Sequence, residues 1–190
     1  MSLVVLCPLR MEARAARAGI RRARPGGDAT VICTGMGPER SRRAAPPVGP
    51  LGPVAVVGMG GAVVGGIQPG EVVVATQVSA FDVSPIPLPG AALVAGRLRN
   101  AGFAVHAGPV ISVPTVATGR QRRELADRGA VVVDMESAWL LENHRGPATV
   151  VRVVTDTPRH ELRSPAVPAR VMRALRTIRR LMPVLIREVC

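Results

Sequence analysis

Aromatic residues are almost absent from this sequence: they make up 2% of it, and tyrosine does not occur at all. Lysine is missing too, so the 25 positions counted as lysine or arginine are all arginine. Proteins that bind single-stranded nucleic acid stack its bases on aromatic side chains. Because those platforms are lacking and the arginines are scattered over the predicted helices, we expect no nucleic-acid partner in spite of the formal net charge of +12.

Cysteine and histidine are also scarce, with three of each. The cysteines, Cys7, Cys33 and Cys190, are odd in number and widely spaced, which fits neither a disulfide framework nor a zinc site. The histidines show no spacing typical of metal ligands. We therefore expect reduced thiols, no metal and no cofactor.

No apolar run is long enough to cross a bilayer. The longest, such as Val54–Val57 and Glu71–Val78, fall far below the ~20 residues that a transmembrane helix needs. The first residues, Met1–Leu6, lead into an apolar strand and lack the basic start and cleavage site of a secretory signal. The sequence thus predicts a cytoplasmic protein.

What the sequence does have is many aliphatic residues in alternating strand and helix patterns. Hydrophobic residues make up 47% of the 190 positions, enough for the core of one domain spanning residues 1–190. Strands are expected at Leu3–Cys7, Thr30–Thr34, Val54–Val57, Glu71–Val78, Ala104–Ser112, Val131–Asp134 and Ala148–Val154. Helices are expected at Arg10–Arg22, after Pro38, at Ala91–Asn100, at Arg120–Arg128, from Ser137 and at Pro165–Val189.

The repeated strand–helix units predict an α/β fold with three layers, in which a central mixed and mostly parallel sheet is flanked by helices. The segment Ser79–Gly90 contains three prolines and is predicted to be a loop.

Acidic residues and glycines follow several of the predicted strands. Glu12 follows the first strand, Gly35–Gly37 the second and Gly58–Gly61 the third. Asp134–Glu136 and Asp156 end two later strands. Ligands of α/β proteins bind at the carboxyl ends of the strands, and glycine turns there let backbone N–H groups approach them. We expect these residues to form one binding site.

The most specific motifs are Val131–Ala138, reading Val-Val-Val-Asp-Met-Glu-Ser-Ala, and Val151–Asp156, reading Val-Arg-Val-Val-Thr-Asp. They resemble the hallmark segments of the purine nucleoside phosphorylase and methylthioadenosine nucleosidase superfamily, in which one strand ends in Met-Glu and the next in Ser-Asp or Thr-Asp. Upstream, Gly58–Gly61 and Pro69–Val73 are similar to the family's glycine turn and the strand start after it. The resemblance implies a phosphorylase/nucleosidase-like fold that cleaves the bond between a purine and a ribosyl carbon.

The resemblance also implies a catalytic role for three acidic residues. Asp156 protonates or hydrogen-bonds N7 of the departing purine, and Glu136 binds the ribose hydroxyls. Glu12 orients or deprotonates a water molecule if the bond is hydrolysed. Apart from the resemblance, Asp156 also fits a turn before Pro158, and Glu136 fits a helix start.

The remaining substrate contacts follow from the same resemblance. The ribose and base are expected to contact Gly60, Gly61 and Met135. An apolar wall for the base is expected from the segment Val113–Val116, which includes Val116.

Phosphate as a co-substrate is left open. Phosphorylases of this family usually carry an arginine just before the third-strand glycine turn, where this sequence has Val56 and Val57. The phosphate contacts are therefore assigned to Gly35, Gly37 and Arg40, since a guanidinium suits phosphate.

The short length, the arginine-rich helices and the Asp134–Ala138 segment look most like the hopanoid-biosynthesis-associated phosphorylase branch, which implies an adenine nucleoside linked to a lipid. The C-terminal segment carries one apolar stripe and many arginines, so it is predicted either to touch an anionic membrane surface or to pack on the sheet. The family also implies a homo-oligomer. The alternatives are a catalytically idle nucleoside-binding or membrane-associated regulatory protein and, third, an RNA-binding module.

Overall fold

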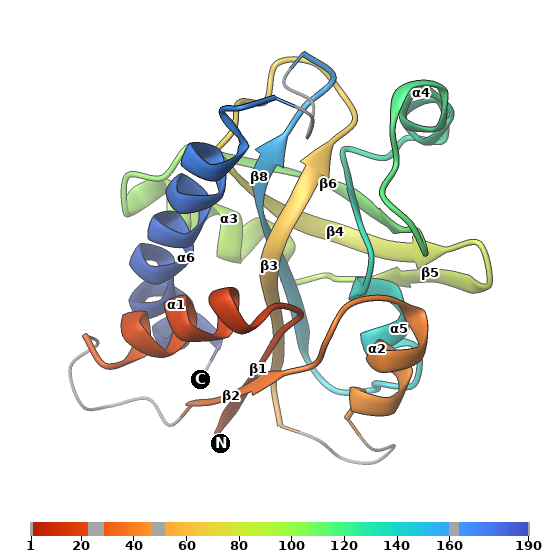
Figure 1. Ribbon diagram of the computed structural model, residues 1–190. Helices are drawn as coiled ribbons and strands as arrows, with labels where there is room; N and C mark the ends of the chain where they lie inside the picture. The colour runs from red at the N-terminus through yellow and green to blue at the C-terminus, as the bar shows by residue number, and fades with distance from the viewer. Residues whose placement is uncertain (1, 23–28, 47–51, 160–163, 190) are drawn as a thin grey trace.

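The computed structural model describes residues 2–22, 29–46, 52–159 and 164–189. Strands and helices alternate along these residues (Figure 1). The strands are β1 (Leu3–Cys7), β2 (Ala29–Cys33), β3 (Val54–Ala62), β4 (Val72–Ala80), β5 (Val83–Pro87), β6 (Val105–Ser112), β7 (Val132–Asp134) and β8 (Ala148–Asp156). The helices are α1 (Arg10–Ile20), α2 (Pro38–Ala44), α3 (Ala91–Asn100), α4 (Gly119–Asp127), α5 (Ser137–Leu141) and α6 (Val167–Val189).

The strands form one sheet of order β2-β1-β3-β7-β6-β4-β5, with β8 paired to both β3 and β4. Because β3 also pairs with β7, and β6 pairs with both β4 and β7, the strands β3, β8, β4, β6 and β7 close into a ring. Five strand pairs are parallel and three are antiparallel. The predicted α/β fold with a mixed, mostly parallel sheet is confirmed. The ring was not foreseen from the sequence.

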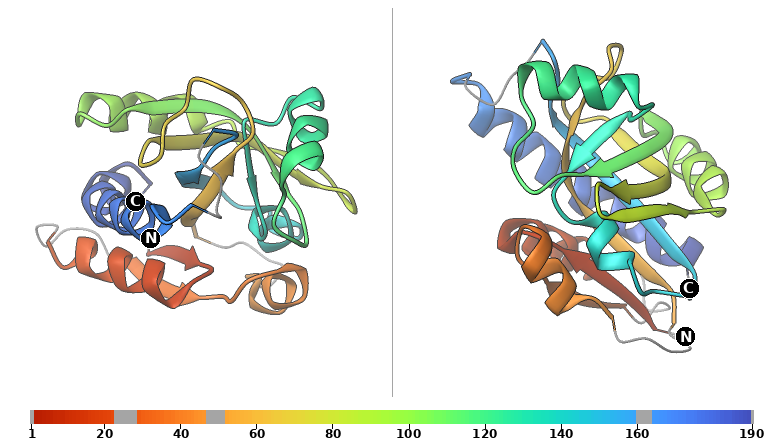
Figure 2. Two further views of the ribbon diagram at one scale, coloured as in Figure 1. Left: turned by 45° about the horizontal axis from the view of Figure 1, so that its top comes forward. Right: turned by 90° about the vertical axis from the view of Figure 1, so that its right-hand side faces the viewer.

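Helices cover the sheet on two sides. Helices α1 and α6 lie side by side against β1, β3 and β8, with α3 next to α6 (Figures 1 and 2). On another side, α5 packs against β4, β5 and β6, and α2 contacts α5. The buried cores between helices and strands are almost entirely aliphatic, as the composition predicts.

The apolar stripe of α6 faces the core. Ile178, Leu181 and Met182 are fully buried and pack among side chains of α1 and the strands. Packing on the sheet, one of the two predictions for this segment, is therefore confirmed, and the stripe is not open to a lipid surface. Membrane contact through the exposed arginines of α6 stays a prediction. In the described ranges, no helix combines the length and apolar character that a membrane span requires.

The predicted loop at Ser79–Gly90 is wrong, because β4 continues to Ala80 and β5 follows it. Among the described strands, β5 pairs only with β4, so it lies at the edge of the sheet. Proline cannot donate a hydrogen bond to a neighbouring strand, and edge strands tolerate it for that reason. Pro85 and Pro87 thus belong to an edge strand.

Candidate active site

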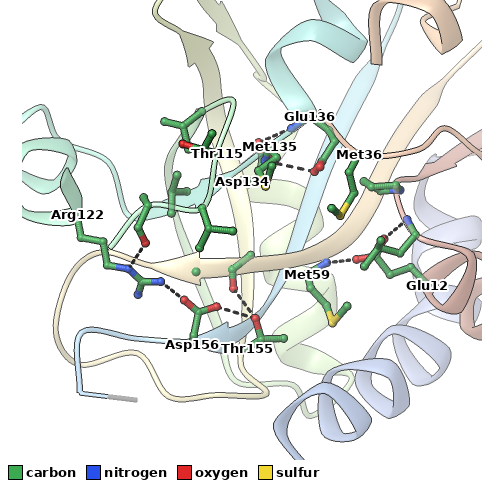
Figure 3. Close-up of a pocket in the computed structure, with 18 residues that line it drawn as sticks. Glu12, Met36, Met59, Thr115, Arg122, Asp134, Met135, Glu136, Thr155 and Asp156 are labelled. Atoms are coloured by element: carbon green, nitrogen blue, oxygen red, sulfur yellow. Dashed lines mark hydrogen bonds and ion pairs between the residues drawn. The ribbon is translucent and has the colours of Figure 1, made fainter. Parts of the chain in front are cut away.

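A cavity of about 200 Å³ lies at the carboxyl ends of β3, β7 and β8, beside the first turn of α1 (Figure 3). The predicted site residues that line it are Glu12, Gly60, Gly61, Val116, Met135, Glu136 and Asp156. The predicted phosphate contacts Gly35, Gly37 and Arg40 lie outside the lining. The sequence therefore predicts where the cavity lies and most of the acidic side chains that line it. The predicted phosphate site at Gly35–Gly37 is not part of that lining.

Glu12 is fixed at the edge of the cavity by two backbone groups. Its Oε2 accepts a hydrogen bond from the N–H of Leu9 at 2.7 Å, within its own helix start, and its Oε1 accepts one from Met59 at 2.7 Å. The side chain is buried, and burial raises the pKa of Glu12 above its ordinary value, although these hydrogen bonds and the nearby Arg152 oppose the shift. Glu12 is thus a held carboxyl group that ionises less readily than an exposed one.

Glu136 follows β7 and lies near a second carboxylate. Asp134 accepts hydrogen bonds from the Ser112 hydroxyl at 2.5 Å and from the Glu136 N–H at 3.1 Å, which fixes the chain as it leaves the strand. The pKa of Glu136 is raised to about 7, chiefly because the side chain is buried; Arg152 opposes this shift, and the charges of Asp134 and Glu12 add to it. Glu136 is therefore poised to change its charge near neutral pH.

Arg152 contacts the carboxylates of both Asp134 and Glu136. It is fully buried in β8, and its Nη2 lies 2.8 Å from Asp134 Oδ2 and 3.6 Å from Glu136 Oε2. The same nitrogen donates to the Ser137 hydroxyl at 2.8 Å. Our sequence reasoning missed Arg152, although a charged residue inside the apolar run 148–154 was a usable signal, because a buried charge needs a partner.

Asp156 forms a buried ion pair on the other side of the cavity. Its Oδ2 accepts a hydrogen bond from Arg122 of α4, and its Oδ1 accepts one from the Thr155 hydroxyl at 2.8 Å. Figure 3 shows this pair well separated from Glu12, which lies beside Met59, at an earlier point along β3. Sequence reasoning also missed Arg122, since four arginines lie within residues 120–128 and nothing in the pattern marks the buried one.

The predicted glycine turn at Gly58–Gly61 is wrong, because all four residues belong to β3. A Cβ on Gly58 would lie 2.6 Å from Arg152 Nη1 and 2.9 Å from Glu12 Oε1. A Cβ on Gly61 would lie 2.7 Å from Asp156 Oδ2. These glycines therefore leave room for charged side chains that cross the strand, whereas Gly35, with φ of +85°, does lie in a turn as predicted.

The cavity combines two kinds of chemistry. Glu12 and Glu136 are carboxyl groups with raised pKa values, and the pKa of Glu136, about 7, suits a group that exchanges protons near neutral pH. Across from them, the Arg122–Asp156 pair can both donate and accept hydrogen bonds. Within the described ranges, no group of three or more His, Cys, Asp or Glu side chains is arranged to hold a metal ion.

Comparison with protein-family models gives no match, and neither does comparison with curated protein sequences. Solved structures do match over nearly the whole chain. Futalosine hydrolase of Helicobacter pylori is 14% identical, with 97% of each chain covered and a TM-score of 0.77. The 5′-methylthioadenosine/S-adenosylhomocysteine nucleosidase of the same organism is 15% identical, with 100% of this chain and 97% of that chain covered and a TM-score of 0.78.

A third match is the S-adenosylhomocysteine nucleosidase of Streptococcus pyogenes, which is 16% identical, with 98% of this chain and 97% of that chain covered and a TM-score of 0.78. At these identities the likeness establishes the fold. The phosphorylase/nucleosidase-like fold implied by the sequence motifs is thereby confirmed.

Proposed function

We propose that this chain is an enzyme that hydrolyses the N-glycosidic bond of a purine nucleoside, with adenine as the base. The observation that carries the proposal is the arrangement of one cavity, in which carboxyl groups with raised pKa values face a buried guanidinium–carboxylate pair across a glycine-bearing strand. The solved structures of the same fold are described as nucleosidases and a futalosine hydrolase, which supports the same reaction class.

Glu136 and Glu12 act on the sugar. As the bond breaks, positive charge develops on the ribosyl carbon, and the ionised Glu136 stabilises that charge while it accepts hydrogen bonds from the ribose hydroxyls. Glu12 takes the proton of the attacking water, because its carboxylate is held in place by Leu9 and Met59. Arg152 and Asp134 keep Glu136 in position from behind.

Asp156 acts on the leaving base. It lies well away from Glu12 in the same cavity, and we infer that the purine occupies this end while its ribose contacts Glu136. A proton or a hydrogen bond given to N7 of the base at this end lets the electron pair of the broken bond settle on the purine. Such assistance is typically worth about 10²–10⁴ in rate.

Water is the favoured nucleophile over phosphate. Four carboxyl side chains line the cavity, and the one guanidinium among the lining residues is already paired with Asp156. A phosphate dianion placed among them would be repelled. The candidate phosphate contacts Gly35, Gly37 and Arg40 do not line the cavity, so no phosphate contact there supports phosphorolysis.

The sugar substituent is proposed to be apolar. Met36 and Val116 line the cavity and are about half exposed, so an apolar rim leads from the site to the surface. Such a rim suits a nucleoside with a 5′-alkyl or alkylthio group, including the lipid-linked adenosine of the hopanoid-associated branch. Assembly into a homo-oligomer and peripheral contact with a membrane belong to the same proposal.

Chromatographic detection of free base tests the proposal. The purified chain is incubated with adenosine, methylthioadenosine and a long-chain 5′-alkyl adenosine, each with and without phosphate. We expect adenine to be released without phosphate, and fastest from a substrate with an apolar substituent. Release that requires phosphate would establish a phosphorylase, and no release from any substrate would favour a nucleoside-binding protein that does not catalyse.

A further inference from the structure

The wall of the cavity is rich in methionine. Three of the seven methionines of the sequence line it, Met36, Met59 and Met135, and none of the described lining residues is aromatic. Methionine is flexible and apolar, so it adapts to ligands of varied shape. Its thioether sulfur can also take up an oxygen atom, which turns an apolar side chain into a polar one. The cavity is therefore open to a chemical change that a purely aliphatic wall would not undergo.

Met36 is the most exposed of the three. Its exposed fraction is 45%, whereas the other two are less exposed. It stands between Gly35 and Gly37, whose φ angles of +85° and +87° belong to the left-handed region that favours glycine. The N–H of Gly35 also donates to the carbonyl of Pro8 at 3.1 Å. The backbone thus holds the Met36 thioether where it contacts both the solvent and the cavity.

We propose that Met36 is a site of reversible oxidation by hydrogen peroxide, and that its sulfoxide closes the cavity to nucleosides with an apolar 5′ substituent. The sulfur attacks one peroxide oxygen, so that an S–O bond forms and the O–O bond breaks. The hydroxide that leaves takes the proton of the transferred oxygen and departs as water. The sulfur is thereby oxidised by two electrons and the peroxide is reduced.

The sulfoxide changes the part of the cavity where the sugar and its substituent are proposed to bind. Figure 3 shows Met36 well away from Asp156, the residue proposed to act on the base. An apolar substituent would lose an apolar contact there and would cover a polar S–O group without giving it a hydrogen bond, which costs free energy. The inference rests on the proposed function and adds a means of regulating it.

Peptide mass spectrometry after treatment with hydrogen peroxide tests the site itself. Met172 of α6 is the matched control for exposure, because it is 50% exposed and does not line the cavity, whereas Met182 of the same helix is fully buried. We expect Met36 and Met172 to become sulfoxides and Met182 to be spared. A Met36 that stays reduced while Met172 is oxidised would overturn the inference.

Adenine release from methylthioadenosine, measured before and after the same treatment, tests the consequence. Dithiothreitol is added after the peroxide, because it reduces an oxidised thiol at the exposed Cys33 but leaves methionine sulfoxide intact. We expect kcat/KM to fall by about 10-fold, as a change of one methylene in an apolar pocket can cause. Methionine sulfoxide reductases A and B together should restore it, since each reduces one epimer.

Two variants assign the loss to one residue. Met172→Leu should match the untreated wild type and should lose activity after peroxide as the wild type does. Met36→Leu should keep its own untreated rate, whatever that rate is, after the same treatment. An equal loss in Met36→Leu, or a wild type that keeps its rate with Met36 fully oxidised, would refute the inference. If the untreated wild type releases no adenine, the proposed function fails, while the mass spectra still decide whether Met36 is oxidised.

Discussion

The carboxyl groups that line this cavity differ in their ion-pair partners and in how strongly burial acts on them. Asp134 is paired with Arg152 and Asp156 with Arg122, so each of these carboxylates has a neutralising partner. Glu136 lies farther from Arg152, at 3.6 Å, and burial dominates its environment. Placement alone can therefore bring the pKa of one acid in such a site close to neutral pH.

The pH dependence of base release should show the ionisation of Glu136. Below a pH of about 7 its carboxyl group is protonated and uncharged, and above that value it is ionised and able to stabilise positive charge on the sugar. We therefore expect log kcat/KM to rise with pH through a pKa near 7 and then level off. In Glu136→Gln the rate should be lower and this rise should be absent. A wild-type profile that is flat across this range, or one that falls, would contradict the assigned role.

Among the elements, β3 gives the site its shape. The strand carries three glycines between Val57 and Ala62, and side chains from α1, α4, β7 and β8 occupy the space where their Cβ atoms would stand. Charged groups from separate elements can thereby meet across a strand that is itself uncharged. The strand is consequently intolerant of side chains at positions where strands normally carry them.

Gly58→Ala tests this requirement. The new Cβ would stand 2.6 Å from Arg152 Nη1 and 2.9 Å from Glu12 Oε1, and both groups are buried and held by other bonds. We expect urea unfolding to show a loss of about 1–3 kcal/mol, as overpacking of a core does, together with loss of base release.

The matched control is Gly96→Ala in the middle of α3, where a Cβ meets nothing within 4 Å. Alanine should stabilise that helix by about 0.5–1 kcal/mol. A Gly58→Ala protein as stable and active as the wild type would show that β3 can accommodate a Cβ beside Arg152 and Glu12, contrary to this account.

Elements with a regular apolar period were predictable from the sequence, and those whose identity depends on distant partners were not. Helix α3 begins at Ala91 and ends at Asn100 as predicted, because its pattern and the following Gly102 are local signals. The sequence predicts a turn at the glycines of β3, since only the fold shows which side chains they accommodate. Arg122 was hidden for the same reason, because its burial depends on Ala62 and Asp156, far away in the chain.

For the whole molecule, the closed ring of strands and the buried α6 decide where the site can form. The ring brings the ends of β3, β7 and β8 together, and α6 packs on α1, the helix that carries Glu12. Stability and function therefore share the same long-range contacts. The sequence could predict that Glu12, Glu136 and Asp156 lie near one another, because they stand at or after the ends of β1, β7 and β8, and all three line the same cavity.

Leu181→Ala tests whether α6 belongs to the core or is available to a membrane. Leu181 is fully buried in the main cluster, so its truncation should cost about 2–5 kcal/mol in urea unfolding. Arg176→Ala, on the exposed face of the same helix, should change stability by no more than about 0.5 kcal/mol. Similar small effects for both variants would mean that the apolar stripe of α6 is not packed as described.

The most direct test of the central claim compares adenine release from methylthioadenosine by the wild type and by Glu12→Gln, in buffer without phosphate. The glutamine keeps the size of the side chain but cannot take a proton from water. We predict that the wild type releases adenine, and that the variant is slower by about 10²–10⁴ while it still binds free adenine as the wild type does. Equal rates for the two proteins, or release by the wild type only after phosphate is added, would contradict hydrolysis at this site.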